Sequence, residues 1–253
     1  MGRLRALVFD VDGTLADTEH LHLRALNIAF ANADLDWHWS MPLYRVLLRV
    51  AGSRERIRHF IDEYHPDLRR YGDREALLSR LHASKNRYYA QFVRQGEARF
   101  RPGIARLLAE AAGQELPLAI ASTAGYENIR VLLEANMGAG AADRFALIAA
   151  DNVVAQKKPS PAIYRWVLGR LELDPRNCIA FEDSRNGVRS AVGARVSTVV
   201  TVNEFTIDDD FTGASIVLDC LGEPEQPFRV LAGSPGPATF VDVGFLRRLV
   251  RGD

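Results

Sequence analysis

The sequence contains little cysteine, no long apolar run and no excess of either charge. Cys178 and Cys220 are the only cysteines among 253 residues, too few for a disulfide scaffold, which favours a reducing compartment. The 32 basic and 32 acidic side chains balance, so the sequence lacks the excess of basic residues that is typical of a general nucleic-acid binder. No apolar run approaches the roughly 18–20 residues of a membrane span, and the run after Arg5 stops at Asp10, short of a signal peptide. We therefore expect a cytoplasmic monomer that binds neither nucleic acid nor membrane.

Short apolar runs alternate with amphipathic stretches along most of the chain. Runs that end in polar residues are typical of strands buried on both faces, and helical periodicity separates them. The expected strands are 6–10, 118–122, 145–150, 178–182 and 197–202, and the expected helices are 104–112, 127–135, 162–171 and 187–194. This alternation predicts an α/β fold with a three-layer, Rossmann-like parallel sheet.

Residues 17–96 interrupt this alternation. They contain amphipathic helix patterns and no convincing strand, which predicts a helical domain inserted after the first strand. The catalytic α/β core would then be 1–16 together with 97–253. The Gly/Pro-rich segment 222–237 is expected to be an irregular surface connection.

Four polar sites come at or after the ends of the predicted strands. They are Asp10-Val11-Asp12-Gly13-Thr14, Ser122-Thr123, Lys157-Lys158-Pro159 and Glu182-Asp183-Ser184. Each also has an ordinary structural interpretation: helix caps for the serines, a solvated basic pair for the lysines, solvated acids for the carboxylates. Because ligands bind at the carboxyl edge of open α/β sheets, four such sites at one edge favour a functional interpretation.

The four sites resemble, in order and approximate spacing, the four motifs of the haloacid dehalogenase superfamily of phosphohydrolases. Hard carboxylate oxygens from Asp10 and Asp183, supported by Glu182, suit Mg²⁺, and the resemblance adds the Asp12 carbonyl as a ligand. Lys158 and Ser122 would hold the phosphoryl oxygens. Asp10 would attack phosphorus, Asp12 would act as general acid and base, and Thr14 completes the first motif. The resemblance also implies that 17–96 is a helical cap that confers substrate specificity.

Further segments are similar to the CbbY-like subfamily, which implies removal of a phosphate from xylulose 1,5-bisphosphate, an inhibitor of Rubisco in the Calvin cycle. These segments are Trp37-x-Trp39, the run around Tyr44, Gly52-x-Arg54-Glu55-Arg56-Ile57, Arg101-Pro102-Gly103 and Lys157-Lys158-Pro159-Ser160-Pro161. The basic start of the helix after Gly52 is a candidate site for the second phosphate, although a solvated basic face is the alternative. The expected substrate-binding residues are Glu19, His22, Tyr44, Gly52, Ser53, Arg54, Thr123, Asn128 and Lys157. The alternatives are that Glu19 only favours a helix N-terminus and that His22 is a structural residue.

Some positions depart from the subfamily pattern. Where the cap loop usually reads Thr-Gly-Gly-Lys, this chain has Ala51-Gly52-Ser53-Arg54. Rival functions are a β-phosphoglucomutase, which returns the phosphoryl group to a sugar, and a phosphoglycolate phosphatase. A signalling receiver domain is about half this length and lacks the helical insert, and intact motifs argue against a non-catalytic scaffold.

Overall fold

The computed structural model describes residues 3–65 and 73–251. The chain divides into two compact units. The larger is Met1–Asp17 together with Arg99–Asp253, and the smaller is Thr18–Ala98. Each unit is described by itself below.

The larger unit is built on one sheet. Its strands are β1 (Ala6–Phe9), β2 (Leu118–Ala121), β3 (Leu147–Ala149), β4 (Cys178–Glu182), β5 (Ser197–Thr201), β6 (Ile216–Leu218) and β7 (Val230–Ala232). Its helices are α5 (Ile104–Gly113), α6 (Tyr126–Met137), α7 (Ala162–Arg170), α8 (Arg185–Gly193) and α9 (Val243–Arg251), with short 3₁₀ turns η2 (Ala141–Arg144) and η3 (Pro175–Asn177).

The strand order is β3-β2-β1-β4-β5-β6-β7, and only β7 is antiparallel to its neighbour. The chain moves outward from β1 through β2 to β3, then returns to add β4 on the other side of β1. The strand order therefore reverses between β1 and β4, which is where open α/β sheets bind ligands. The predicted α/β fold with a parallel sheet and a helical insert after the first strand is confirmed.

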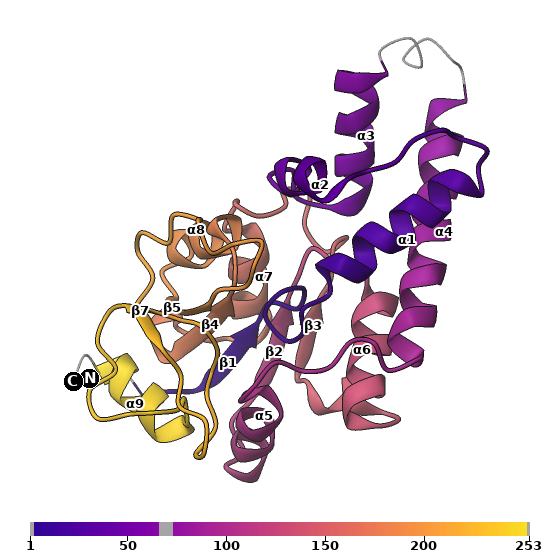
Figure 1. The fold of residues 1–253 in the computed structure, drawn as a ribbon. Helices are drawn as coiled ribbons and strands as arrows, with labels where there is room; N and C mark the ends of the chain where they lie inside the picture. The colour runs from indigo at the N-terminus through magenta and orange to yellow at the C-terminus, as the bar shows by residue number, and fades with distance from the viewer. Residues whose placement is uncertain (1–2, 66–72, 252–253) are drawn as a thin grey trace. The chain divides into compact units, whose positions relative to one another are not determined.

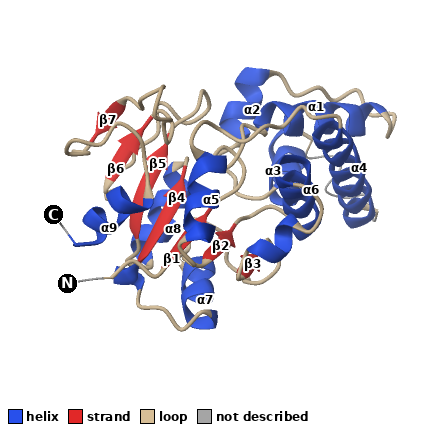
Figure 2. Cartoon of the chain, turned by 90° about the horizontal axis from the view of Figure 1, so that it is seen from below, coloured by secondary structure: helices blue, strands red, loops and turns tan. Residues whose placement is uncertain are grey.

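Helices cover both faces of the sheet. Helices α5 and α9 contact each other and the sheet at β2 and β4, whereas α7 and α8 pack on the other face (Figures 1 and 2). Because side chains alternate along a strand, Ala6 and Val8 point toward α7 while Leu7 and Phe9 point away from it. Alanines also face α7 from β2 and β4, and these small side chains let the helix approach the sheet closely.

The smaller unit consists of helices around an aromatic core. The helices are α1 (Glu19–Ala31), α2 (Met41–Leu47), α3 (Ser53–Tyr64) and α4 (Arg74–Arg94). Phe30 and Trp39 lie with ring centroids 5.2 Å apart, and Trp39 and Phe60 lie 5.1 Å apart. Trp39 and Phe30 are fully buried. Aromatic burial of this extent stabilises a small unit whose described elements are all helices.

The end of the chain differs from the expectation. Segment 222–237 was expected to be irregular, but it contains β7, which pairs with β6 through a register irregularity. The three residues of β7 are all exposed, so no alternation of apolar and polar residues marks the strand in the sequence. None of the helices in the described part of the chain is long and apolar enough to cross a membrane.

Candidate active site

Strand register brings Asp10 and Glu182 together. In the β1–β4 pair Phe9 lies opposite Phe181, and the Asp10 N–H donates to the Phe181 carbonyl at 3.0 Å. Asp10 and Glu182 are the next residues along the two strands, so they lie side by side at the usual spacing of a parallel pair, about 4.8 Å. Asp10 continues the face of Ala6 and Val8, and Glu182 continues the face of Cys178 and Ala180. Both carboxylates are thus directed to the α7 side of the sheet edge.

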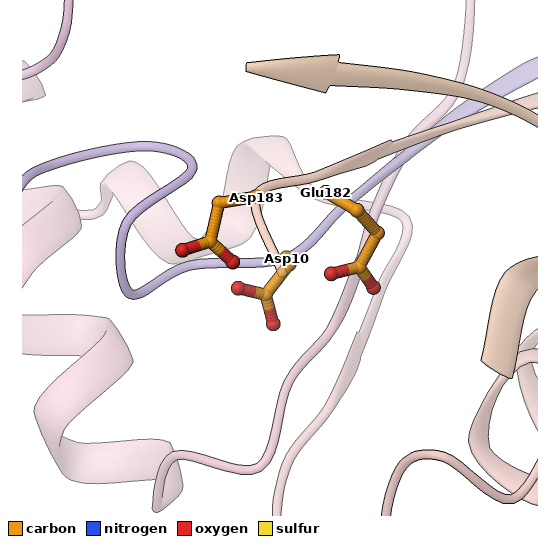
Figure 3. Close-up of side chains that lie close together, drawn as sticks. All are labelled: Asp10, Glu182 and Asp183. Atoms are coloured by element: carbon orange, nitrogen blue, oxygen red, sulfur yellow. The ribbon is translucent and has the colours of Figure 1, made fainter. Parts of the chain in front are cut away.

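Asp183 completes a buried acidic triad. Ligand oxygens of Asp10, Glu182 and Asp183 lie within 4.8 Å of one another (Figure 3). The three side chains are 8%, 1% and 6% exposed, so water screens their mutual repulsion poorly. Such a cluster requires positive charge nearby.

Lys158 supplies one positive charge. Its Nζ donates to Asp10 Oδ1 at 2.7 Å and to Glu182 Oε1 at 2.6 Å. Burial by itself disfavours the ammonium form, but the two carboxylates outweigh it and raise the pKa of Lys158. The lysine was expected near this edge, and the alternative of a solvated basic pair fails because Lys158 is only 5% exposed.

Tyr164 holds the same oxygen of Glu182. From α7 its hydroxyl donates to Glu182 Oε1 at 2.5 Å. Burial and then the charge of Glu182 raise the pKa of Tyr164 well above its usual range, so the phenol stays protonated and remains a donor. Two donors thus converge on Oε1, whereas Oε2 is buried without a hydrogen-bond partner among residues 3–65 and 73–251.

Two glycines make room for the carboxylates. A Cβ on Gly13 would lie 2.1 Å from Asp183 Oδ2, and a Cβ on Gly187 would lie 1.7 Å from Glu182 Oε2. Gly13 also has a φ of +81°, which side-chain-bearing residues rarely adopt. The first motif therefore needs glycine for its turn and for the approach of Asp183. In α8, glycine provides the space that Glu182 Oε2 occupies.

The site carries an excess of negative charge. Three carboxylates and one ammonium leave a formal charge of about −2 in a buried setting, which is strongly unfavourable. Burial raises the pKa of Asp10 to about 7, with the charge of Lys158 opposing the shift and that of Glu182 adding to it. A divalent cation would balance the charge, and the orphaned Glu182 Oε2 offers it a ligand. Three hard carboxylate oxygens are a donor set that fits Mg²⁺.

Arg101 braces the loop of the first motif, a role that the motif comparison did not anticipate. Its guanidinium is 8% exposed and donates to the Gly13 carbonyl and to the carbonyls of Val202, at 2.5 Å, and Asp219, at 2.9 Å. Its Nε also lies 3.4 Å from Asp17 Oδ1. One buried side chain thereby ties the turn at Gly13 to the ends of β5 and β6.

The other expected core residues lie around the same sheet edge. Ser122 directly follows β2, and its Oγ accepts from the Ala124 N–H at 3.2 Å rather than capping α6. Thr14 is buried, and its Oγ1 has no partner within the described residues. Ser184 does cap α8, accepting from the Gly187 N–H at 3.2 Å. Asp12 and Thr123 are half-buried, Lys157 is half-buried beside Lys158, and Asn128 is buried in α6.

In the helical unit, the expected substrate-binding residues form two groups. Tyr44 donates to Glu19 and accepts from Arg56 Nη1 at 3.3 Å, and His22 stacks on Tyr89 with centroids 4.2 Å apart. These contacts hold buried polar groups in place.

The second group surrounds the start of α3. Gly52, with φ +91°, is the N-cap, and Ser53 begins the helix. Arg54 Nη2 pairs with Glu75 Oε2 at 3.0 Å and donates to Ser79 Oγ at 3.2 Å. Arg58 pairs with the same Glu75 at 2.9 Å. The expected basic helix start is therefore partly balanced by an acid from α4, a residue that sequence reasoning did not consider.

The fold and this acidic site define a class of hydrolases. Residues 4–195 match the haloacid dehalogenase-like hydrolase family, and the chain belongs to that family.

Within it, the chain is similar to the plasmid-encoded protein CbbY of Cupriavidus necator, with 49% identity over 224 residues, 88% of each chain. The crystal structure of CbbY from Rhodobacter sphaeroides in complex with phosphate superposes with a TM-score of 0.80 at 40% identity, covering 86% of this chain and 94% of that one. A mutant of the same CbbY in complex with xylulose-(1,5)bisphosphate superposes at 0.79 with 38% identity and the same coverage.

Proposed function

We propose that this protein is a Mg²⁺-dependent phosphatase that removes a phosphate from xylulose 1,5-bisphosphate through an aspartyl-phosphate intermediate. The observation that carries the reaction is the meeting of Asp10, Glu182, Asp183 and Lys158 at one buried sheet edge. The substrate rests on the likeness to CbbY, one structure of which holds that bisphosphate. Protection of Rubisco and a cytoplasmic location belong to the same proposal.

The chemistry divides between Asp10 and Asp12. A carboxylate oxygen of Asp10 attacks phosphorus, and the bond between phosphorus and the ester oxygen breaks as Asp12 donates its proton to the leaving alkoxide. Water then attacks phosphorus, its proton passes to Asp12, and phosphate leaves with Asp10 restored. Asp10, Glu182, Asp183 and the Asp12 carbonyl would hold Mg²⁺, which neutralises the charge of the phosphoryl group when bound.

Lys158 has two roles in this proposal. Its contacts with Asp10 and Glu182 orient both carboxylates, and its charge attracts phosphoryl oxygens. Ser122, Thr123, Thr14, Asn128 and Lys157 supply further donors from the same unit.

The helical unit is proposed to act as the cap that selects the substrate. Glu19, His22 and Tyr44 would bind hydroxyls, and the α3 start at Gly52, Ser53 and Arg54 would bind the second phosphate. Arg54 would exchange its contact with Glu75 for the phosphate, while Arg58 would remain with Glu75.

Phosphate release tests the reaction and the substrate together. With saturating Mg²⁺ we expect kcat/KM for xylulose 1,5-bisphosphate to exceed the values for ribulose 1,5-bisphosphate, glucose 1-phosphate and phosphoglycolate by at least tenfold. Isomerisation of a hexose phosphate without phosphate release would instead identify a mutase, and a preference for phosphoglycolate would refute the bisphosphate.

Arg54→Ala and Arg58→Ala form a matched pair for the second phosphate site. Loss of one charge-assisted contact of about 1.5–3 kcal/mol predicts that Arg54→Ala raises KM for the bisphosphate about 10–100-fold. Arg58→Ala should leave it unchanged, because both arginines share Glu75 but only Arg54 stands in the first turn of α3. Equal effects of the two substitutions would show that the cap's basic helix start does not bind the phosphate.

A further inference from the structure

Asp183 is held by a side chain from the loop that follows β5. Asn203 Nδ2 donates to Asp183 Oδ2 at 2.8 Å. The orientation of this amide is determined by a second contact, because Asn203 Oδ1 accepts from the Phe205 N–H at 2.9 Å. An amide whose oxygen already faces a donor must turn its amino group the other way. The amino group of Asn203 therefore points toward the Asp183 carboxylate.

The loop that carries Asn203 is itself well anchored. The Asn203 N–H donates to Thr206 Oγ1 at 3.1 Å, and the Thr206 N–H donates to the Asn203 carbonyl at 3.1 Å. Further along, Asp209 Oδ2 accepts from the Arg185 N–H at 2.8 Å. The loop therefore contacts the segment after β4 at two points, the side chain of Asp183 and the backbone N–H of Arg185.

The contact between Asn203 and Asp183 packs against the first motif. A Cβ on Gly13 would lie 2.6 Å from Asn203 Nδ2 as well as 2.1 Å from Asp183 Oδ2. Fixing Oδ2 between an amide and the glycine turn fixes the plane of the carboxylate. The direction in which Asp183 presents its other oxygen follows from that plane.

We propose that Asn203 is a positioning residue for the divalent cation. Its hydrogen bond holds the Asp183 carboxylate in the orientation that binds the cation, so the contact raises the affinity of the site for the cation. This inference rests on the proposed function in one respect, that the acidic triad binds a divalent metal. Contacts of this kind behind a metal ligand typically change metal affinity about 10–100-fold.

A purely structural role for Asn203 predicts something different. If the side chain served only to fold the loop, its removal would lower the melting temperature of the metal-free protein and leave metal affinity unchanged. Asp209→Ala is the matched control, because it loosens the same loop at Arg185 without removing a contact to Asp183.

Mn²⁺ titration followed by electron paramagnetic resonance of the free ion measures the affinity directly, without turnover. We expect Asn203→Ala to weaken Mn²⁺ binding about 10–100-fold, and Asp209→Ala to bind Mn²⁺ as the wild type does. At saturating Mn²⁺ the KM of Asn203→Ala for substrate should equal that of the wild type, because the variant affects the cation site alone.

The outcomes separate this inference from the proposed function. Wild-type affinity in Asn203→Ala, or equal weakening in Asp209→Ala, would overturn the role of Asn203 while leaving the metal-dependent reaction intact. A wild-type protein that binds no Mn²⁺ would overturn the metal site itself and with it the proposed mechanism.

Discussion

Gly187→Ala places a methyl group where Glu182 needs space. The new Cβ would lie 1.7 Å from Glu182 Oε2, 2.3 Å from Cδ and 2.9 Å from Oε1. Reaching an ordinary contact of 3.4 Å requires a shift of about 1.7 Å (3.4 − 1.7). Such a shift breaks the contacts of Oε1 with Lys158 and Tyr164, at 2.6 and 2.5 Å.

Three contributions change the unfolding free energy of the variant. Alanine in a helix stabilises by about 1 kcal/mol relative to glycine, overpacking destabilises by about 1–3 kcal/mol, and the two broken contacts of Glu182 Oε1 cost about 1.5–3 kcal/mol each. The net loss of unfolding free energy is therefore about 3–8 kcal/mol, so urea unfolding first establishes that the variant is folded under the assay conditions. In folded protein, displacing Glu182, which is proposed to bind the cation, should lower kcat/KM about 10–100-fold.

Gly169→Ala in α7 is the matched control, because among the described residues nothing outside its chain neighbours and its own helix backbone lies within 4 Å of the new Cβ. It should be stabilised by about 1 kcal/mol in urea unfolding and retain full activity. The test is phosphate release, measured for Gly187→Ala and Gly169→Ala side by side. Wild-type activity in Gly187→Ala would refute the reasoning that Glu182 Oε2 must occupy the space beside α8.

Three further predictions concern the buried charges. Asp10→Asn should release no phosphate yet fold, because an amide does not replace the nucleophile. In EDTA, folding raises the pKa of Asp10 from 3.8 to about 7. The contribution of Asp10 to the unfolding free energy is therefore full below about pH 4 and is lost as the pH rises to 7. The unfolding free energy of the wild type relative to that of Asp10→Asn should then fall by up to about 4 kcal/mol across that range, because the pKa differs by roughly 3 and each pH unit contributes about 1.4 kcal/mol. A difference that does not change with pH would contradict the burial argument. Tyr164→Phe removes one donor from Glu182 and should lower the unfolding free energy by about 1–3 kcal/mol, and unchanged urea unfolding would show that the hydrogen bond contributes nothing.

Sequence patterns were enough to identify strands β1 to β5 of the sheet and the acidic motifs. The apolar runs at 6–10, 118–122 and 178–182 predicted β1, β2 and β4, because burial on both faces leaves a local signature. The spacing of polar residues after these runs pointed to Asp10, Lys158, Glu182 and Asp183, which the structure brings together. Such inferences succeed because the carboxyl ends of parallel strands necessarily share one edge.

Other features were not predicted. β7 carried no alternation of apolar and polar residues, because all its residues are exposed. α9 does carry a helical pattern of buried apolar and exposed basic residues, but it lies beyond the strand–helix alternation from which the elements were predicted. The pairing of Arg54 with Glu75 joins α3 to α4 over 21 positions, so the sequence around Gly52 does not show that an acid from the next helix partly balances the basic helix start.

The amino-acid order alone therefore determined the class of fold and the kind of reaction, and it predicted the residues proposed to perform that reaction, since each depends on patterns within a few residues. The tertiary structure decided how those residues are held. Tyr164 on Glu182, Asn203 on Asp183 and Arg101 on the Gly13 carbonyl join residues 18, 20 and 88 positions apart. Hydrogen bonds over such separations depend on how the strands are ordered and how the helices pack, which no local pattern encodes.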